Sequence, residues 1–127
     1  MKILLMVPAV NMTKRYGRFA PATGSTPILG LGYIAAVLER EGYEVQIIDG
    51  LVESFTLREL MTRIKKFHPA VFGISTTSLT YLFIEDLARE VKKRFPKIKI
   101  IIGGPHVSSM PLPTMKSKVF DLSLIHI

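Results

Sequence analysis

Two adjacent glycines, Gly103 and Gly104, are the residues best placed to contact a ligand. They follow an apolar run at residues 100–102 and precede Pro105 and His106. Such a run is typical of a buried parallel strand. Ligands of open α/β sheets bind at the carboxyl ends of strands, so glycines there let a bulky, flat or phosphate-bearing ligand approach the backbone. We expect a side chain at Gly104 to enter that ligand's space. The alternative interpretation is a tight turn.

A second glycine pair, Gly30 and Gly32, matches a dinucleotide-binding fingerprint together with Ala35 and Asp49. In that fingerprint the glycines form the turn directly after the first strand. Here residues 8–25 intervene and the glycines fall inside a predicted helix. We therefore expect these glycines to let the helix pack closely on the sheet or on a ligand, and Asp49 to end a strand.

The chain lacks the residues that several other kinds of functional site require. A phosphate-binding P-loop needs a lysine after its glycines, and none follows Gly30 or Gly32. A receiver domain would place acidic residues where this chain has residues 8–11. His68, His106 and His126 show no metal-ligand spacing, and His68 fits a helix end.

The net charge of +7 is spread along the chain. Lysines and arginines at residues 65–66 and 92–94 fall in the last turns of predicted helices, where cations complement the helix dipole. This distribution predicts no nucleic-acid partner. Lys14, Arg15 and Arg18 differ, because they share a loop with Tyr16 and Phe19 and would meet phosphates or a partner domain.

Strand and helix patterns alternate along the chain. The expected strands are residues 2–7, 44–48, 70–75, 98–102 and 119–125. A first helix is capped by Thr26, begins at Pro27 and stops at Gly42. A second opens with a capping box at residues 56–59 and ends before Pro69, and a third covers about residues 80–94.

Each helix carries an apolar face that we expect to be buried. The residues are Leu31, Ile34, Ala35 and Leu38, then Leu57, Leu60, Met61 and Ile64, then Ile84, Leu87, Ala88 and Val91. Successive units of this kind wind right-handed into one domain. The predicted fold is α/β, a flavodoxin-like or Rossmann-like doubly wound five-stranded parallel sheet.

Composition narrows the class of protein. The chain has 127 residues, 48% of them hydrophobic, and no cysteine. It therefore offers no disulfide, thiolate metal site or cysteine-held iron–sulfur cluster. Pro8 ends the first apolar run well short of the apolar region of a signal peptide, so we expect a buried first strand there instead. No run approaches the ~20 apolar residues of a membrane span. A cytoplasmic protein is expected.

Taken together, five segments resemble the cobalamin-binding domain of B12-dependent radical SAM enzymes, over residues 1–121. They are the first strand ending at Pro8, residues 27–42, residues 45–49, residues 72–75 and residues 103–106. The resemblance implies a cobalamin-binding module held across the carboxyl edge of the sheet. The implied cofactor-binding residues are Asn11, Met12, Gly30, Ser75, Thr76, Thr77, Ser78, Leu79, Gly103, Gly104, Pro105 and His106.

The sequence differs from methyltransferase-type cobalamin domains at the residues that would coordinate the cobalt. Methyltransferase-type cobalamin domains carry Asp-x-His-x-x-Gly after the first strand, whereas residues 7–13 here contain no histidine. The resemblance then implies a cobalt whose lower face lacks a strong nitrogen donor, with Asn11 and Met12 nearest to it. Axial ligation tunes a cofactor's electronics, so this arrangement would favour the low-coordinate cobalt of methyl transfer.

The resemblance also implies a missing partner domain. A parent radical SAM enzyme would carry a [4Fe-4S] cluster and S-adenosylmethionine in a barrel whose cysteines this chain lacks. We expect that barrel to follow the domain. Residues 122–127 match the in-frame translation of a common sequencing adapter, which predicts an artefactual tail; a natural apolar strand is the alternative.

A second hypothesis for function remains open. The chain could be another doubly wound module, such as the amino-terminal half of a glycosyltransferase that binds a nucleotide or nucleotide-sugar.

Overall fold

The computed structural model describes residues 1–8, 29–50, 55–76, 80–104 and 120–124. Five parallel strands form one sheet in the order β2-β1-β3-β4-β5. The strands are β1 (Lys2–Val7), β2 (Glu44–Asp49), β3 (Val71–Ser75), β4 (Lys99–Gly103) and β5 (Leu122–Leu124). This is the strand order of flavodoxin-like folds, so the predicted fold class is confirmed.

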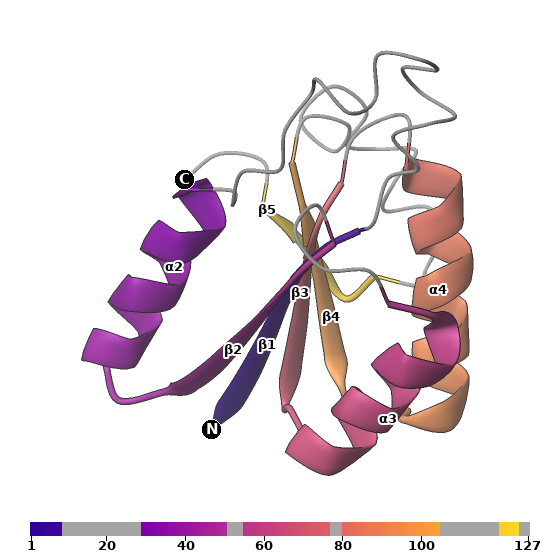
Figure 1. The fold of residues 1–127 in the computed structure, drawn as a ribbon, viewed down its shortest axis with the longest axis horizontal. Coiled ribbons are helices and arrows are strands. Elements are labelled where there is room, and N and C mark those ends of the chain that lie inside the picture. The colour runs from indigo at the N-terminus through magenta and orange to yellow at the C-terminus, as the bar shows by residue number, and fades with distance from the viewer. Residues whose placement is uncertain (9–28, 51–54, 77–79, 105–119, 125–127) are drawn as a thin grey trace.

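Three helices cover the two faces of the sheet (Figure 1). They are α2 (Leu29–Arg40), α3 (Leu57–Phe67) and α4 (Tyr81–Arg94). Helix α2 lies on one side of the strands, and α3 and α4 lie together on the other (Figure 1). None of the described helices is long and apolar enough to span a membrane.

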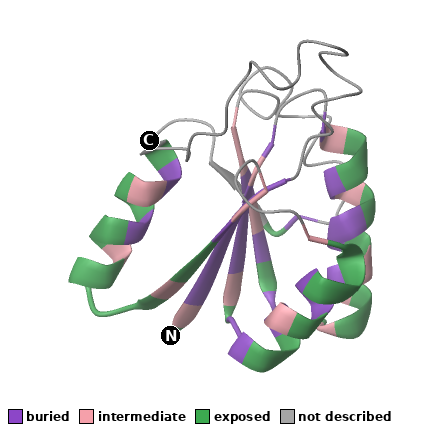
Figure 2. Cartoon of the chain, in the orientation of Figure 1, coloured by how far each residue is buried: buried purple, intermediate pink, exposed green. Residues whose placement is uncertain are grey.

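The core has two parts because side chains alternate between the faces of a strand. Leu4 and Met6 of β1 point toward α3 and α4 and join the larger cluster, whereas Ile3 and Leu5 point toward α2. Figure 2 shows the resulting burial, with exposed residues concentrated on the outer faces of the helices. All four of these β1 residues are buried.

Local signals in the sequence explain where the helices start and stop. Gly42, after α2, has φ +94°, a backbone conformation in which glycine carries no steric cost. The hydroxyl of Thr56 accepts from Glu59 N at 3.2 Å and caps α3. His68 ends α3 at φ 54° and its N–H donates to Ile64 O, so its predicted place at a helix end is confirmed.

Two predictions of buried helix faces are wrong in part. Leu57, the first residue of α3, is 44% exposed, whereas Leu60, Met61 and Ile64 of the same helix are buried. Ile34 is 40% exposed, because the sheet face beside it carries no second helix among the described residues. The inward face predicted for α4 is confirmed. The predicted cap of α2, Thr26 and Pro27, lies outside the described residues.

Candidate functional site

The ends of β3 and β4 meet at the carboxyl edge of the sheet. Ser75 pairs with Gly103 in the parallel register. One residue further on, Thr76 N donates to Gly103 O at 2.9 Å. A backbone hydrogen bond therefore connects the end of β3 directly to the end of β4, the two segments that the sequence analysis placed at one site.

Gly104 is held against the same segment. Its φ is +105°, and a Cβ built on it would lie under 3.0 Å from both the carbonyl oxygen and the amide nitrogen of Thr76, and 3.1 Å from Ser75 Oγ. The expectation that a side chain here would enter a ligand's space needs correction. The space beside the Gly104 α-carbon is filled by the protein's own backbone, so glycine is required to close the β3–β4 junction.

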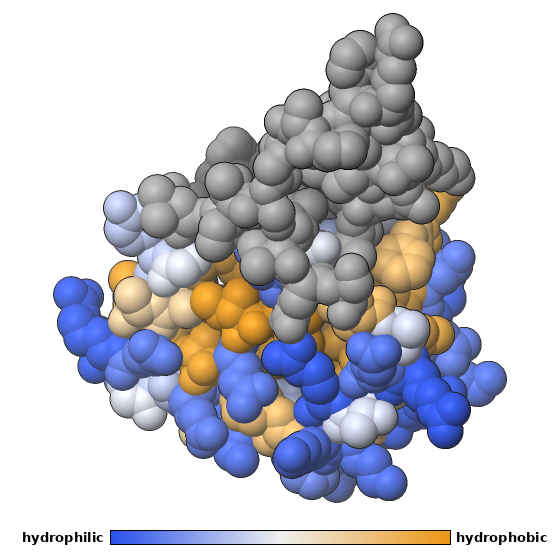
Figure 3. Space-filling view, viewed as in Figure 1, coloured by the Kyte–Doolittle hydropathy of each residue, from blue (hydrophilic) through white to orange (hydrophobic). Residues whose placement is uncertain are grey.

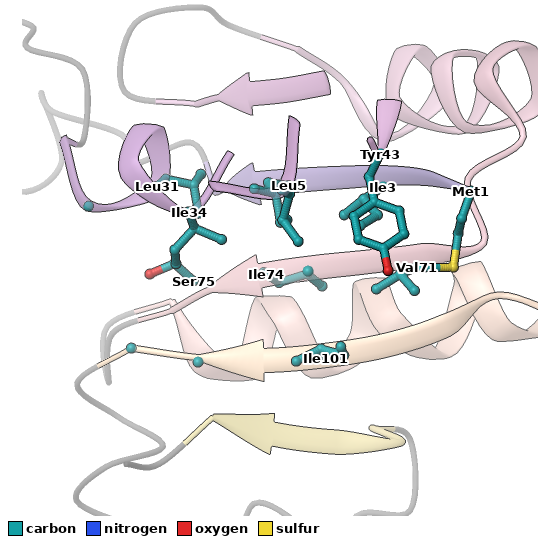
Figure 4. Close-up of a pocket in the computed structure, with 15 residues that line it drawn as sticks. Met1, Ile3, Leu5, Leu31, Ile34, Tyr43, Val71, Ile74, Ser75 and Ile101 are labelled. Carbon is teal, nitrogen blue, oxygen red and sulfur yellow. The ribbon is translucent and has the colours of Figure 1, made fainter. Parts of the chain in front are cut away.

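An apolar groove extends from this junction along the α2 side of the sheet (Figure 4). Its volume is about 570 Å³. Side chains of β1, β3 and β4 form its floor and α2 forms one wall. The groove is lined by Met1, Ile3, Leu5, Gly30, Leu31, Ile34, Leu38, Tyr43, Val71, Gly73, Ile74, Ser75, Ile101, Gly103 and Gly104.

Among the described residues, α2 is the one helix on this face of the sheet, and it covers only part of that face. Leu31 and Ala35 of α2 pack on Ile3, Leu5 and Val7 of β1. On β3 and β4 the same face carries Val71, Gly73 and Ile101, which remain along the open groove. Figure 3 shows apolar side chains reaching the surface beside α2. Such a surface is suited to a flat, apolar group.

The polar groups of the groove are few and lie at its carboxyl end. Ser75 supplies a hydroxyl there, visible in Figure 4 beside Ile34. Among the described residues no group of three or more His, Cys, Asp or Glu side chains could hold a metal ion.

The structure brings together five of the residues expected at the site. Gly30, Ser75, Gly103 and Gly104 line the groove, and Thr76 is buried beneath its end. The other seven lie outside the described residues: Asn11, Met12, Thr77, Ser78, Leu79, Pro105 and His106. The basic loop residues Lys14, Arg15 and Arg18 lie outside them as well.

The role predicted for the helix glycines changes. Outside the adjacent residues and the backbone of α2 itself, no described atom lies within 4 Å of a Cβ built on Gly30 or Gly32, so neither glycine is needed for packing α2 on the sheet. Gly30 instead leaves open space at the groove wall. The expectation of close packing on a ligand stays a prediction for Gly30.

The apolar floor of the groove was missed from the sequence. The sequence analysis placed the floor residues in strands but did not predict which face of the sheet they occupy. These residues are Ile3, Leu5, Val71 and Ile101. The period of two in each strand was the available signal, because it separates Ile3 and Leu5 from Leu4 and Met6. That alternation does not reveal which face is left open.

Comparison with known protein families identifies the domain. Residues 17–124 match the model of the B12 binding domain. The chain belongs to the B12 binding domain family. This match favours cobalamin over the nucleotide-sugar hypothesis.

Curated relatives are much longer proteins. The chain is 37% identical over 116 residues to an uncharacterized methyltransferase, PH0819, of Pyrococcus horikoshii, covering 91% of this chain and 24% of the relative. It is 30% identical over 128 residues to cytidylyl-2-hydroxyethylphosphonate methyltransferase of Streptomyces wedmorensis, covering 87% and 23%. The chain thus spans about a quarter of the length of the curated relatives it matches.

Solved structures share the fold. A cobalamin-binding protein from Desulfitobacterium hafniense superposes with a TM-score of 0.67 at 17% identity, over 96% of this chain and 51% of that one. The response regulator TrrA from Thermotoga maritima superposes at 0.58 with 15% identity, over 100% and 88%. At these identities both comparisons concern the fold alone.

Proposed function

We propose that this chain is the cobalamin-binding module of a larger B12-dependent methyltransferase of the radical SAM type. Membership of the B12 binding domain family carries the first part. Two longer relatives bear methyltransferase names, which supports methyl transfer in the parent protein. Cobalamin would supply the cobalt that accepts and donates the methyl group.

The groove is the part of this structure that fits the cofactor. Cobalamin carries a nucleotide tail with a flat aromatic base, and the groove offers aliphatic walls from Leu5, Leu31, Val71 and Ile101. At the carboxyl end, Ser75 Oγ and the backbone of Gly103 and Gly104 could meet the polar atoms of the tail. In this arrangement the chain binds the tail and orients the corrin at the edge of the sheet.

Cofactor binding is tested by loading the purified chain with hydroxocobalamin. After gel filtration we expect the visible absorbance of the corrin to elute with the protein at about one equivalent. A chain that is folded by circular dichroism but retains no corrin would overturn the proposal.

The radical SAM context has a separate test, because this chain contains no cysteine to hold a cluster. We expect the full-length gene to encode a further domain with three closely spaced cysteines. A complete reading frame without such a domain would reject the radical SAM part and leave cobalamin binding untouched.

A further inference from the structure

Two threonine hydroxyls are buried beneath the candidate site. Thr76 is 1% exposed and Thr80 is 8% exposed, and they are the buried polar side chains of the described core. Their Oγ1 atoms lie 2.8 Å apart, within hydrogen-bond distance. In an otherwise apolar core such a pair is costly unless its hydroxyls are satisfied, so each constrains where the other lies.

Thr80 occupies the N-cap position of α4 but does not cap it. Thr56 stands at the equivalent position of α3, and its hydroxyl accepts from Glu59 N. Thr80 makes no side-chain capping bond, and its backbone is at φ −107°, ψ −6° rather than extended. A threonine at an N-cap normally stabilises its helix through that bond. Here the hydroxyl is directed to Thr76 instead.

The residue that Thr80 contacts is the one that closes the site. Thr76 N donates to Gly103 O, and the α-carbon of Gly104 lies against the Thr76 backbone. The hydroxyl contact therefore ties the start of α4 to the junction of β3 and β4. A displacement of Thr76 would move the glycine turn that ends the groove.

We propose that Thr80 is a positioning residue for the cobalamin site, acting through its hydroxyl contact with Thr76. The inference rests on the proposed function. Thr80 itself does not line the groove. Its hydroxyl holds Thr76 and, through Thr76, holds Gly103 and Gly104 in the arrangement that receives the nucleotide tail.

The experiment compares Thr80→Val with Thr80→Ser in the whole chain. Valine keeps the branched shape and removes the hydroxyl, whereas serine keeps the hydroxyl. We expect Thr80→Val to weaken the binding of hydroxocobalamin by at least about tenfold, a change of about 1.4 kcal/mol. Thr80→Ser should bind within about threefold of the wild type. Binding is measured by absorbance titration at a temperature where circular dichroism shows every variant folded.

Thr62→Val is the matched control. It removes a threonine hydroxyl whose hydrogen bond stays within its own helix, with Thr62 Oγ1 donating to Arg58 O on the exposed face of α3. Its affinity should equal that of the wild type. Because serine would restore stability as well as binding, the free energy of unfolding of each variant is measured in urea beside its affinity. Positioning predicts that Thr80→Val binds more weakly at a temperature where it is fully folded.

Thr76→Val supplies a second route to the same contact. It should weaken binding as Thr80→Val does, because it removes the same contact from the other side. The double variant should bind more tightly than independent effects of the two substitutions would give, because both remove the shared contact. Wild-type affinity in Thr80→Val would overturn this inference. Failure of both valine variants to fold, with Thr80→Ser folded, would also overturn it by showing that the hydroxyls serve the fold. Absence of binding by the wild type would instead overturn the proposed function.

Discussion

The α-carbon of Gly104 lies against the backbone of Thr76 with no room for a side chain between them. The contact joins two residues 28 positions apart in sequence, at the ends of neighbouring strands. It fixes the β3 and β4 ends as one unit. Gly104 also has φ +105°, so its backbone conformation and its surroundings both require glycine.

We expect Gly104→Ala to lower the free energy of unfolding by about 3 kcal/mol and to abolish cobalamin retention. Strain from the positive φ contributes about 1–2 kcal/mol, and displacement of Thr76 adds to it. Urea unfolding followed by circular dichroism measures the first effect, and co-elution of the corrin measures the second.

Gly42→Ala is the control for that variant. Gly42 has φ +94°, but no described atom lies within 4 Å of the place that an alanine Cβ would take there. It should lose only the conformational part, about 1 kcal/mol, and still retain cobalamin. If the two variants lose equal stability, the close approach of Thr76 is not what demands glycine at residue 104.

A second prediction concerns the carboxylate that leads into β5. Asp121 Oδ2 accepts from Ile100 N at 2.8 Å and from Lys92 Nζ at 2.5 Å. Partial burial alone would raise the pKa of Asp121, but the hydrogen bonds from Lys92 and Ile100 and the charges of Lys92 and Lys99 outweigh it and hold that pKa below 3.8.

A lowered pKa in the folded state means that the ionised carboxylate stabilises the fold above the unfolded pKa of about 3.9. That stabilisation is lost as the pH falls through the folded pKa. We therefore expect the wild type to lose more unfolding free energy between pH 5 and pH 3 than Asp121→Asn does, in urea titrations. Asp86→Asn, at an exposed ion pair with Arg89, should follow the wild type. A parallel pH dependence in Asp121→Asn would contradict the role of this carboxylate.

The corrected face of α3 gives a third prediction. Leu60 is fully buried, whereas Leu57 is 44% exposed three residues earlier. Leu60→Ala should lower the unfolding free energy by about 2–5 kcal/mol through a core cavity. Leu57→Ala should cost under about 1 kcal/mol. If both variants lose the same unfolding free energy in urea, Leu57 belongs to the buried face of α3, as the sequence predicted.

The order of elements was predictable because each strand and helix carries its own local signal. Short apolar runs predicted the strands, while Gly42 and Thr56 marked a helix end and a helix start. Pairing of β3 with β4 agrees with the tendency of strands that are consecutive in sequence to neighbour each other in a sheet. These signals are local, so one sequence suffices to find them.

The site was predictable only in outline. Glycines at a strand end indicate that another group lies close to their backbone. The sequence does not show whether that group is a ligand or, as at Gly104, the backbone of Thr76. The groove depends on how far α2 extends over the sheet, which is a tertiary property. The contact between the Thr80 and Thr76 hydroxyls was hidden for the same reason, because it depends on how the start of α4 lies against the end of β3.

The adapter origin of residues 122–127 stays a prediction, and the codons at the end of the gene would test it. In the structure residues 122–124 form β5.

The last prediction tests whether the groove binds the base, and it compares two residues of α2. Ile34 lines the groove and is 40% exposed, whereas Val37 is 51% exposed on the same helix and does not line it. A carboxylate at residue 34 would have to lose water when an apolar base enters the groove, a cost that a carboxylate at residue 37 avoids. We expect Ile34→Glu to weaken hydroxocobalamin binding at least about tenfold and Val37→Glu to leave it within about twofold. Both side chains are partly exposed, so both variants should remain folded by circular dichroism. Equal affinities of the two folded variants in absorbance titration would mean that the base does not occupy the groove, even if the chain binds cobalamin at the edge of the sheet.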